Sequence, residues 1–170
     1  MSAFIKIAEK NGYHFEMLKA TQMVNDAVRL SVVKKMEEAL WTLREKTIGV
    51  WGLAFKPNTD DLRNAPSLDI LKALVDGGAR VQAYDPVAMD KAKEIFPDIA
   101  YADSAVSAAA NVDGLLILTE WDHFKKVNLK KLKTAMKGKV VVDGRNMFRP
   151  ELMAKAGFSY FSVGRPELKN

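Results

Sequence analysis

Hydrophobic positions divide the chain into two regions with different periods. From Ser2 to Leu43 apolar residues recur at steps of three and four, the period of an amphipathic helix. Gly12 is the only glycine in this stretch and proline is absent, so we expect a short helix, a break at Gly12 and a long second helix. The apolar positions of the second helix are Leu18, Val24, Val28, Val32, Met36, Ala39 and Leu43. Such a helix needs a surface to pack on: the following domain, a domain outside this chain, or a second copy of itself.

From Lys46 onward, short apolar runs alternate with helical stretches. Thr47–Trp51 is the first predicted strand, and a helix is predicted over 64–75, with Pro66 early and Gly77 at its end. The other predicted strands are 80–84, 99–101, 114–118, 140–143 and 159–161. The other predicted helices are 87–95, one capped by Asp103 or Ser104, 129–136 and 151–156. This alternation predicts an α/β fold, a Rossmann-like doubly wound parallel sheet over residues 46–170, preceded by a long helical arm over residues 1–45.

Composition excludes several classes of protein. With 170 residues, 48% of them hydrophobic and 28% charged, we expect a folded domain. The chain has no cysteine, which excludes disulfides, cysteine-bound metals and a cysteine nucleophile within it. The two histidines, His14 and His123, stand far apart, so we expect no metal site. No apolar run is long enough for a bilayer, and the N-terminus lacks the apolar stretch of a signal peptide; we therefore expect no membrane partner and a cytoplasmic location.

The formal net charge of +5 is modest, and the lysines are spread over helix faces. No basic stripe interleaved with aromatic residues accompanies them, so we expect no nucleic-acid partner. The excess positive charge fits either a solvated helix surface or a preference for anionic ligands such as phosphates.

Ligands of doubly wound sheets bind beyond the carboxyl ends of the strands. Three polar loops are predicted there, over residues 52–63, 119–124 and 143–149. In the first, Gly49 and Gly52 are spaced G-x-x-G, a weak match to the dinucleotide fingerprint G-x-G-x-x-G. Asp85 follows the second strand, where such folds place a ribose-binding acid, but Asp85-Pro86 is also a turn sequence. We favour the turn and expect no NAD site in this domain.

The first loop also carries charges just before a predicted helix. Lys56 and Arg63 lie beside Asp60 and Asp61, and cations at a helix N-terminus favour a phosphate or pyrophosphate. The alternative is a surface salt-bridge cluster of these four residues. We do not expect the aspartates to form a metal or acid–base pair, because adjacent side chains rarely point the same way.

The other two loops contain an arginine and two aromatic residues of interest. Arg145 is suited to pairing with a phosphate, stacking on a base or bonding a carbonyl; alternatively it bridges to Asp143 or to a helix terminus. Trp121 is suited to stacking on a ligand ring, but we favour a position covering the sheet edge. No nucleophile stands near His123 in the sequence, so a catalytic triad is not expected.

The run from Ile48 to Pro86, IGVWGLAFKPNTDDLRNAPSLDILKALVDGGARVQAYDP, resembles the C-terminal domain of nucleotide-sugar 6-dehydrogenases, the UDP-glucose/GDP-mannose dehydrogenase family. Three further stretches agree with that family in order and spacing: LLILTEWDHF at 115–124, VVVDGRNMF at 140–148 and FSYFSVGRP at 158–166. Residues 12–29 resemble the family's linker and central helix. FKPNTDDLR is the specific part, whereas the surrounding strand and helix patterns are generic.

The resemblance implies a function, and overall likeness favours the bacterial UDP-glucose 6-dehydrogenases within the family. These enzymes oxidise the C6 alcohol of UDP-glucose to a carboxylate in two NAD-dependent steps. An N-terminal domain holds NAD, a cysteine forms the covalent intermediates, the C-terminal domain completes the UDP-sugar site, and the central helix builds the dimer. By motif, Phe55 and Lys56 would contact the UDP-sugar, Arg145 would contact the nucleotide-sugar, and Arg63 would reach toward NAD held by the other domain.

The family's NAD fingerprint, catalytic cysteine and lysine–asparagine pair belong before residue 1. We therefore expect no catalytic residue in this chain, no NAD binding by it alone, and no hydride transfer without the missing N-terminal NAD-binding domain. We expect UDP or UDP-glucose as ligand and a homodimer formed through residues 13–43. Three alternatives stay open: a UDP-N-acetylmannosamine or GDP-mannose dehydrogenase, a stand-alone nucleotide-sugar-binding or assembly module, and an NAD-binding domain.

Overall fold

Six parallel strands form a single sheet in a computed structural model that describes residues 2–168. The strands lie in the order β3-β2-β1-β4-β5-β6. Their bounds are β1 Thr47–Trp51, β2 Arg80–Tyr84, β3 Ala100–Tyr101, β4 Gly114–Ile117, β5 Val140–Asp143 and β6 Ser159–Ser162. Successive strands are added toward one edge of the sheet from β1 to β3 and toward the other edge from β4 to β6, so the strand order switches between β1 and β4, as in doubly wound nucleotide-binding folds. The predicted α/β fold is confirmed.

The strands β4 and β5 are buried along their whole length because helices cover both faces of the sheet. Every residue of β4 and of β5 is buried. This explains their continuous apolar sequences, since a strand covered on both faces does not alternate apolar with polar residues.

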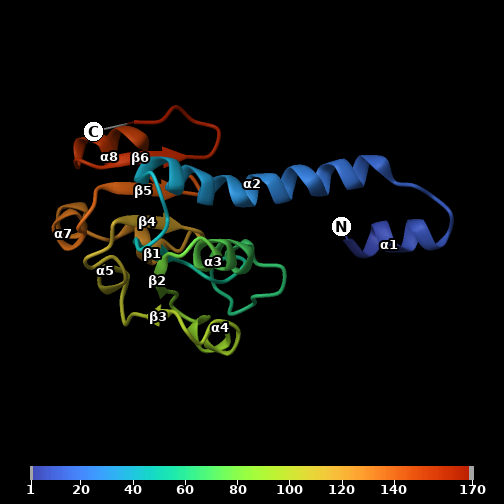
Figure 1. The fold of residues 1–170 in the computed structure, drawn as a ribbon, viewed down its shortest axis with the longest axis horizontal. Helices are drawn as coiled ribbons and strands as arrows, with labels where there is room; N and C mark the ends of the chain where they lie inside the picture. The colour runs from blue at the N-terminus through green and yellow to red at the C-terminus, as the bar shows by residue number, and fades with distance from the viewer. Residues whose placement is uncertain (1, 169–170) are drawn as a thin grey trace.

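Helices flank the sheet on both sides (Figure 1). On one side α3 (Pro66–Asp76) packs beside α2 (Glu16–Leu40), which also contacts β4 and β5. On the other side α5 (Ala105–Ala108) contacts α7 (Leu129–Ala135) and packs on β1 and β2. The remaining helices of the domain are α4 Met89–Ile95, α6 Asp122–Lys125 and α8 Pro150–Lys155.

Local sequence explains the ends of α3 and the start of α5. The Ser104 side chain accepts a hydrogen bond from the Ser107 N–H and caps α5, which confirms one of the two predicted caps. Pro66 occupies the first turn of α3, and Gly77 follows its last residue, as predicted. The short helix α6 was not predicted; it occupies the end of the predicted polar loop 119–124.

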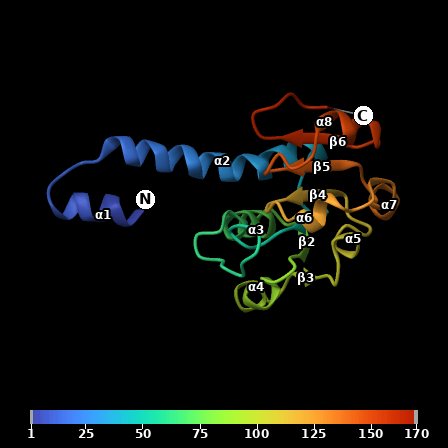
Figure 2. The ribbon, with the colours of Figure 1, turned by 180° about the vertical axis from the view of Figure 1, so that it is seen from behind.

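The helical arm projects from the α/β domain (Figures 1 and 2). The short helix α1 (Ser2–Lys10) folds back along α2 after a turn at Gly12, which has a positive φ of 74°. An ion pair of 2.9 Å between Glu9 and Lys19 joins the two helices. Although α2 is 25 residues long, no helix within residues 2–168 is long and apolar enough to cross a membrane.

The predicted apolar stripe of α2 divides into two halves. Val32 and Met36 are 3% and 0% exposed and belong to the core, whereas Val24 and Val28 are 61% and 45% exposed. A Cβ on Gly114 would lie 2.5 Å from the Met36 sulfur, so glycine at the start of β4 allows α2 to approach the sheet closely. The C-terminal half of α2 is therefore part of the α/β core, and the N-terminal half is a solvated arm.

Candidate functional site

Three loops lie side by side at the carboxyl edge of the sheet. They follow β1, β4 and β5, which are neighbours in the strand order. The predicted placement of the polar loops 52–63, 119–124 and 143–149 at one edge is confirmed.

A fully buried carboxylate, Asp85, organises the first of these loops. Both carboxylate oxygens accept hydrogen bonds, and all donors come from the protein itself. The five donors are the N–H groups of Leu53 (2.7 Å), Ala54 (3.1 Å), Val87 (3.0 Å) and Ala88 (2.9 Å) and the indole Nε1 of Trp121 (3.2 Å). The predicted Asp-Pro turn is confirmed. Trp121 is 7% exposed and covers the sheet edge, as expected.

The crevice between the β1 and β4 loops is filled by protein atoms. Gly52 has a φ of 88°, and a Cβ on it would lie 2.5 Å from the Cβ of Thr119. The Thr119 hydroxyl donates to the carbonyl of Ala54 at 2.6 Å. Since Asp85 already occupies the N–H groups of Leu53 and Ala54, this turn offers neither space nor donors to a pyrophosphate. The residues present do not fit an NAD molecule bound in this crevice.

After Leu53 and Ala54, which are held by Asp85 and Thr119, the first loop exposes Phe55 and Lys56 to solvent. The backbone N–H of Phe55 donates to the Asp61 carbonyl at 2.9 Å, and the Ser67 hydroxyl at the start of α3 donates to the Leu53 carbonyl. Phe55 is 47% exposed, and within residues 2–168 Lys56 forms no ion pair. An ordered loop therefore displays an aromatic ring next to a cation that is free to meet a ligand.

The acidic residues of the loop point in different directions. Asp61 forms two hydrogen bonds with Arg63, from Nε at 3.0 Å and from Nη2 at 2.8 Å, whereas Asp60 pairs with Lys91 of α4 at 2.7 Å. The hydrogen bonds from Arg63 hold the pKa of Asp61 far below its usual range. The predicted salt-bridge cluster is thus only partly correct, because Lys91 takes the place given to Lys56.

Arg63 keeps 88% of its side chain exposed despite this pair, which suits a contact with a group outside the domain. Within residues 2–168 no group of three or more histidines, aspartates or glutamates is arranged to hold a metal ion.

The loop after β5 is held by a second buried carboxylate, Asp143. One oxygen accepts the backbone N–H of Arg145 at 2.9 Å. The other accepts the N–H of Phe148 at 3.0 Å and the phenol of Tyr160 at 2.7 Å. Burial, together with the charge of Asp143, raises the pKa of the Tyr160 phenol well above its usual value. Asp143 therefore fixes the backbone from which the Arg145 side chain extends.

The Arg145 side chain pairs with Glu120, the residue that follows Thr119 in the β4 loop. Its Nε and Nη2 donate to the two carboxylate oxygens of Glu120, with Nη2 to Oε1 at 3.2 Å. Burial alone would raise the pKa of Glu120, but the hydrogen bonds and charge of Arg145 outweigh it and hold that pKa below its usual value. Of the two protein partners expected from the sequence, Asp143 binds only the backbone N–H, and the guanidinium bridges to Glu120 instead.

The pairing of Glu120 with Arg145 follows from strand register, which is why sequence reasoning missed it. Ile117 of β4 lies opposite Asp143 of β5, so residues shortly after each come together. Residues that follow neighbouring parallel strands lie close together, so the sequence can indicate this pair only once the order of the strands in the sheet is known.

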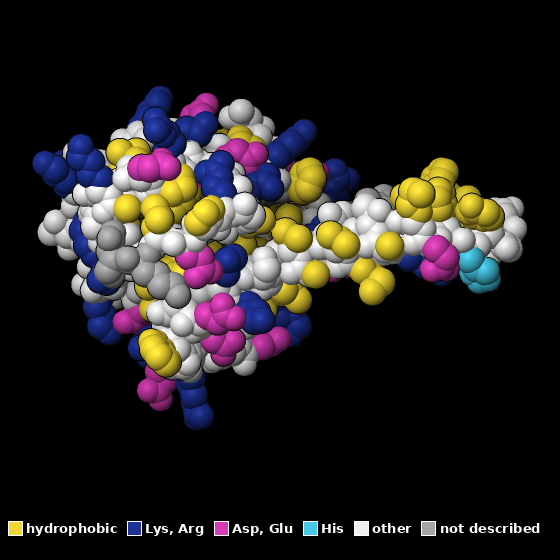
Figure 3. Space-filling model, turned by 90° about the horizontal axis from the view of Figure 1, so that it is seen from above, with side chains coloured by type: hydrophobic (Ala, Val, Ile, Leu, Met, Phe, Trp, Pro, Cys, Tyr) yellow, Lys and Arg dark blue, Asp and Glu magenta, His cyan; other side chains and the backbone are white. Residues whose placement is uncertain are grey.

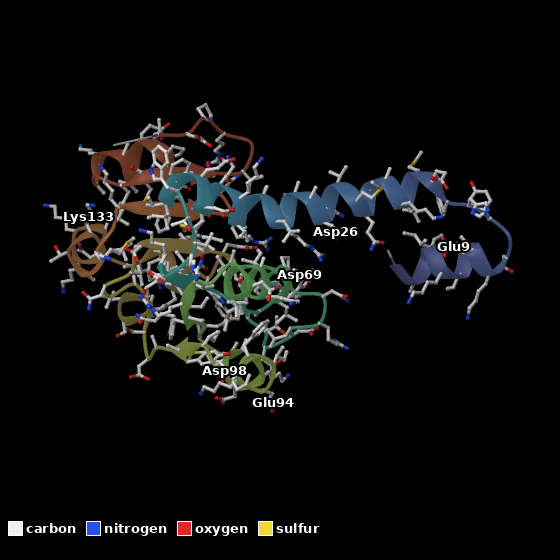
Figure 4. The ribbon with its side chains drawn as sticks, in the orientation of Figure 1. Glu9, Asp26, Asp69, Glu94, Asp98 and Lys133 are labelled. Carbon is white, nitrogen blue, oxygen red and sulfur yellow. The ribbon has the colours of Figure 1, made fainter. Side chains whose placement is uncertain are left out.

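Arg145 also lines a cleft of about 100 Å³ between the arm helix and the sheet edge. Residues of α2, α3 and the carboxyl-end loops form its walls, namely Val28, Arg29, Val32, Pro66, Ile70, Leu118, Gly144, Arg145 and Val163. Arg29 is paired with Asp69 at 3.2 Å and lies 3.7 Å from Asp26, and the two aspartates face the space between α2 and α3 (Figure 4). The sequence did not single out Arg29, because its place beside the site depends on how α2 docks.

The structure thus places Phe55, Lys56, Arg63 and Arg145 at one edge of the sheet. No hydrogen bond or ion pair among the described residues links Phe55 or Lys56 to Arg145. Their assignment to ligand binding stays a prediction.

Known proteins resemble this chain over nearly its whole length. A model of the UDP-glucose/GDP-mannose dehydrogenase family, UDP binding domain, matches residues 49–150. The chain is 41% identical to UDP-glucose 6-dehydrogenase TuaD of Bacillus subtilis over 169 residues, 99% of this chain and 37% of that protein. It is also 41% identical to UDP-glucose 6-dehydrogenase AglM of Haloferax volcanii, over 95% of this chain and 36% of that protein.

A solved UDP-glucose dehydrogenase from the archaeon Pyrobaculum islandicum has the same fold, with a TM-score of 0.83 and 34% identity over 96% of this chain and 36% of that one. The present chain therefore spans little more than a third of the length of these relatives. With a family model that matches more than half of its residues, the chain belongs to the UDP-glucose/GDP-mannose dehydrogenase family and contains the family's UDP-binding domain.

Proposed function

We propose that this chain is the UDP-sugar-binding part of an NAD-dependent UDP-glucose 6-dehydrogenase, with an arm over residues 1–45 and a binding domain over residues 46–170. The observation that carries the proposal is the anchored loop that displays Phe55 and Lys56 at the carboxyl edge of a UDP-binding domain. The names and identities of the relatives favour UDP-glucose over other nucleotide sugars.

Each predicted ligand contact has a physical basis. Lys56 is a cation without a counter-charge among the described residues, which suits a phosphate. Phe55 offers an exposed ring beside it for the apolar face of a base or sugar. Arg145 supplies a planar guanidinium from the neighbouring loop.

Oxidation of an alcohol to a carboxylate removes four electrons and takes up one water, so it requires two NAD⁺ and groups that this domain does not offer. The chain contains no cysteine, and its own crevice is filled by Thr119 and the Asp85 network. We propose that NAD is held by a separate N-terminal domain toward which Arg63 points, and that this chain alone transfers no hydride.

The test is calorimetric titration of the chain with UDP, UDP-glucose, GDP and NAD. We expect binding of the two UDP compounds and not of the others. Lys56→Ala and Arg145→Ala should each weaken UDP-glucose binding by about 1–3 kcal/mol, because each removes a charge-assisted contact. Lys155→Ala, which removes an exposed lysine of α8, is the matched control and should bind like the parent chain.

Two results would count against the proposal. Unchanged affinity in both Lys56→Ala and Arg145→Ala would remove the site from this edge of the sheet. Tighter binding of GDP than of UDP would favour a GDP-mannose dehydrogenase, and tighter binding of NAD would favour a dinucleotide-binding domain.

We also propose that the arm pairs with a second copy of the chain. Its exposed apolar side chains are Phe4, Ile7, Tyr13, Met17, Met23, Val24, Val28 and Leu30. Figure 3 shows hydrophobic side chains along the projecting arm. A row of exposed apolar side chains along one element marks an interaction surface, and the arm of a second copy would cover it.

A further inference from the structure

The way in which Glu120 holds Arg145 leaves one edge of the guanidinium open. Glu120 takes the Nε–H and one N–H of Nη2. A guanidinium carries five N–H donors in a rigid plane, so three remain, two on Nη1 and one on Nη2. One N–H of Nη1 and the remaining N–H of Nη2 lie along the end of the guanidinium, the edge that forms two parallel hydrogen bonds to a phosphate or carboxylate.

The backbone on the Glu120 side of the pair is anchored. Thr119 on one side of Glu120 donates to the Ala54 carbonyl, and Trp121 on the other side is buried and donates to Asp85. A glutamate held between two such anchors has a fixed position from which to orient its partner.

The Arg145 side is anchored in the same manner. Gly144 before it donates its N–H to the Ile117 carbonyl at 2.9 Å. Asn146 after it exchanges two hydrogen bonds of 3.0 Å with the backbone of Val163. The pair therefore bridges two rigid loops, with 33% of the Arg145 side chain and 39% of the Glu120 side chain exposed.

We infer that Glu120 is a positioning residue, which orients the guanidinium of Arg145 so that its free edge meets an anionic or carbonyl group of the nucleotide sugar. The inference rests on the proposed function and extends it to a residue that touches no ligand. Loss of Glu120 leaves Arg145 able to rotate, and ordering a long side chain at the moment of binding lowers affinity.

The same pair is also compatible with competition between Glu120 and the ligand for Arg145. Whether removal of Glu120 weakens or tightens ligand binding distinguishes positioning from competition. If Glu120 competed with the ligand for Arg145, its removal would tighten binding. If Glu120 positions Arg145, its removal weakens binding, and it does so only when residue 145 is an arginine, because lysine lacks the planar fork.

The experiment is a double-mutant cycle on UDP-glucose affinity with the chain as it stands. We expect Glu120→Gln to weaken binding about threefold to tenfold, and Glu120→Ala to weaken it at least as much. In an Arg145→Lys background the Glu120→Gln change should have no further effect. Glu151→Gln, which removes the charge of another glutamate near an arginine, Arg149, is the matched control and should leave affinity unchanged.

Circular dichroism and thermal unfolding of each variant check that the fold is retained, as expected for a partly exposed ion pair. Tighter binding or unchanged binding in Glu120→Gln would overturn the inference. So would an equal loss in the arginine and lysine backgrounds, since that would report general structural damage. If Arg145→Ala weakens binding while Glu120→Gln does not, only this inference fails; if the parent chain binds no UDP compound, the proposed function fails with it.

Discussion

At the scale of single residues, two buried carboxylates shape the candidate site through hydrogen bonds to the protein's own backbone. Asp85 directly follows β2, Asp143 is the last residue of β5, and both are 0% exposed. Each accepts backbone N–H groups from the loop that follows, so the charge is stabilised and the loop conformation is fixed at once. A buried acid at the end of a strand is therefore a poor indicator of a ligand site until its hydrogen bonds are counted.

The first prediction compares two tyrosine hydroxyls. Tyr160 donates to the charged Asp143 at 2.7 Å, whereas Tyr101 lies 3.0 Å from the neutral carbonyl of Phe96. Because hydrogen bonds to buried charges are the stronger ones, Tyr160→Phe should lower the free energy of unfolding by about 1.5–3 kcal/mol and Tyr101→Phe by about 0.5–1.5 kcal/mol. Urea denaturation measures both, and equal losses would contradict the role given to Asp143.

At the scale of helices and strands, α2 belongs to two different environments. Its C-terminal half supplies Val32, Val33 and Met36 to the core, and its N-terminal half is solvated. The second prediction follows from this division. Met36→Ala should lower the free energy of unfolding by about 2–5 kcal/mol because it leaves a cavity against β4.

Met23→Ala is the matched change on the arm, where the side chain is 71% exposed. In dilute solution, where self-association does not contribute, it should alter stability by less than about 0.5 kcal/mol. Similar losses in the two variants would show that the halves of α2 do not differ in this way.

The amino ends of β1 and β4 are joined by Asp113, which gives the third prediction. Its carboxylate accepts the Thr47 N–H at 2.9 Å and pairs with Lys137 at 2.8 Å. Burial alone would raise the pKa of Asp113, but the hydrogen bonds from Lys137 and Thr47 outweigh it and hold the pKa below its usual value. The stabilisation is therefore present above the unfolded pKa of about 3.9 and is lost as the pH falls through the lower folded pKa.

Unfolding of the parent chain and of Asp113→Asn between about pH 6 and pH 2.5 measures this contribution. We expect the variant to be less stable by about 1.5–3 kcal/mol at pH 6. The difference should shrink below about pH 4, where Asp113 is protonated first in the unfolded parent chain and, at lower pH, in the folded one. A difference that stays constant with pH would mean that the charge of Asp113 is not what matters.

At the scale of the whole molecule, a doubly wound domain carries an arm that extends away from it (Figures 1 and 2). The fourth prediction concerns the apolar surface of that arm. We expect the chain to sediment as a dimer at tens of micromolar and the double variant Met23→Glu, Val24→Glu to sediment as a monomer, because the added charges would be buried between copies. Glutamate is a good helix former, so the helix itself should persist, which circular dichroism checks.

Leu152→Glu is the matched control, since Leu152 is an apolar residue of α8 that is 49% exposed and lies off the arm. This variant should remain a dimer. A monomeric parent chain at these concentrations would contradict self-association through the arm.

Local patterns in the sequence were sufficient for the elements and for the fold class. Apolar periodicity, together with helix-start and helix-end residues such as Pro66, Gly77 and Ser104, placed the strands and all helices except α6 to within a few residues. The Asp85-Pro86 turn and the buried Trp121 were predicted for the same reason, because each depends on neighbours close in sequence or on a strong preference for burial. Alternation of strands and helices restricts the topology to a parallel sheet, which is why the fold class followed.

Contacts between loops were decided only by the tertiary structure. Asp60 pairs with Lys91 and Arg145 pairs with Glu120 because strand order and register bring distant loops together, and no local pattern specifies which charges then meet. The division of α2 has the same origin: its apolar period is continuous along the sequence, but the sheet extends under only one half of the helix. Periodicity shows that a face needs covering, whereas the dimensions and packing of the folded domain decide how much of that face is covered.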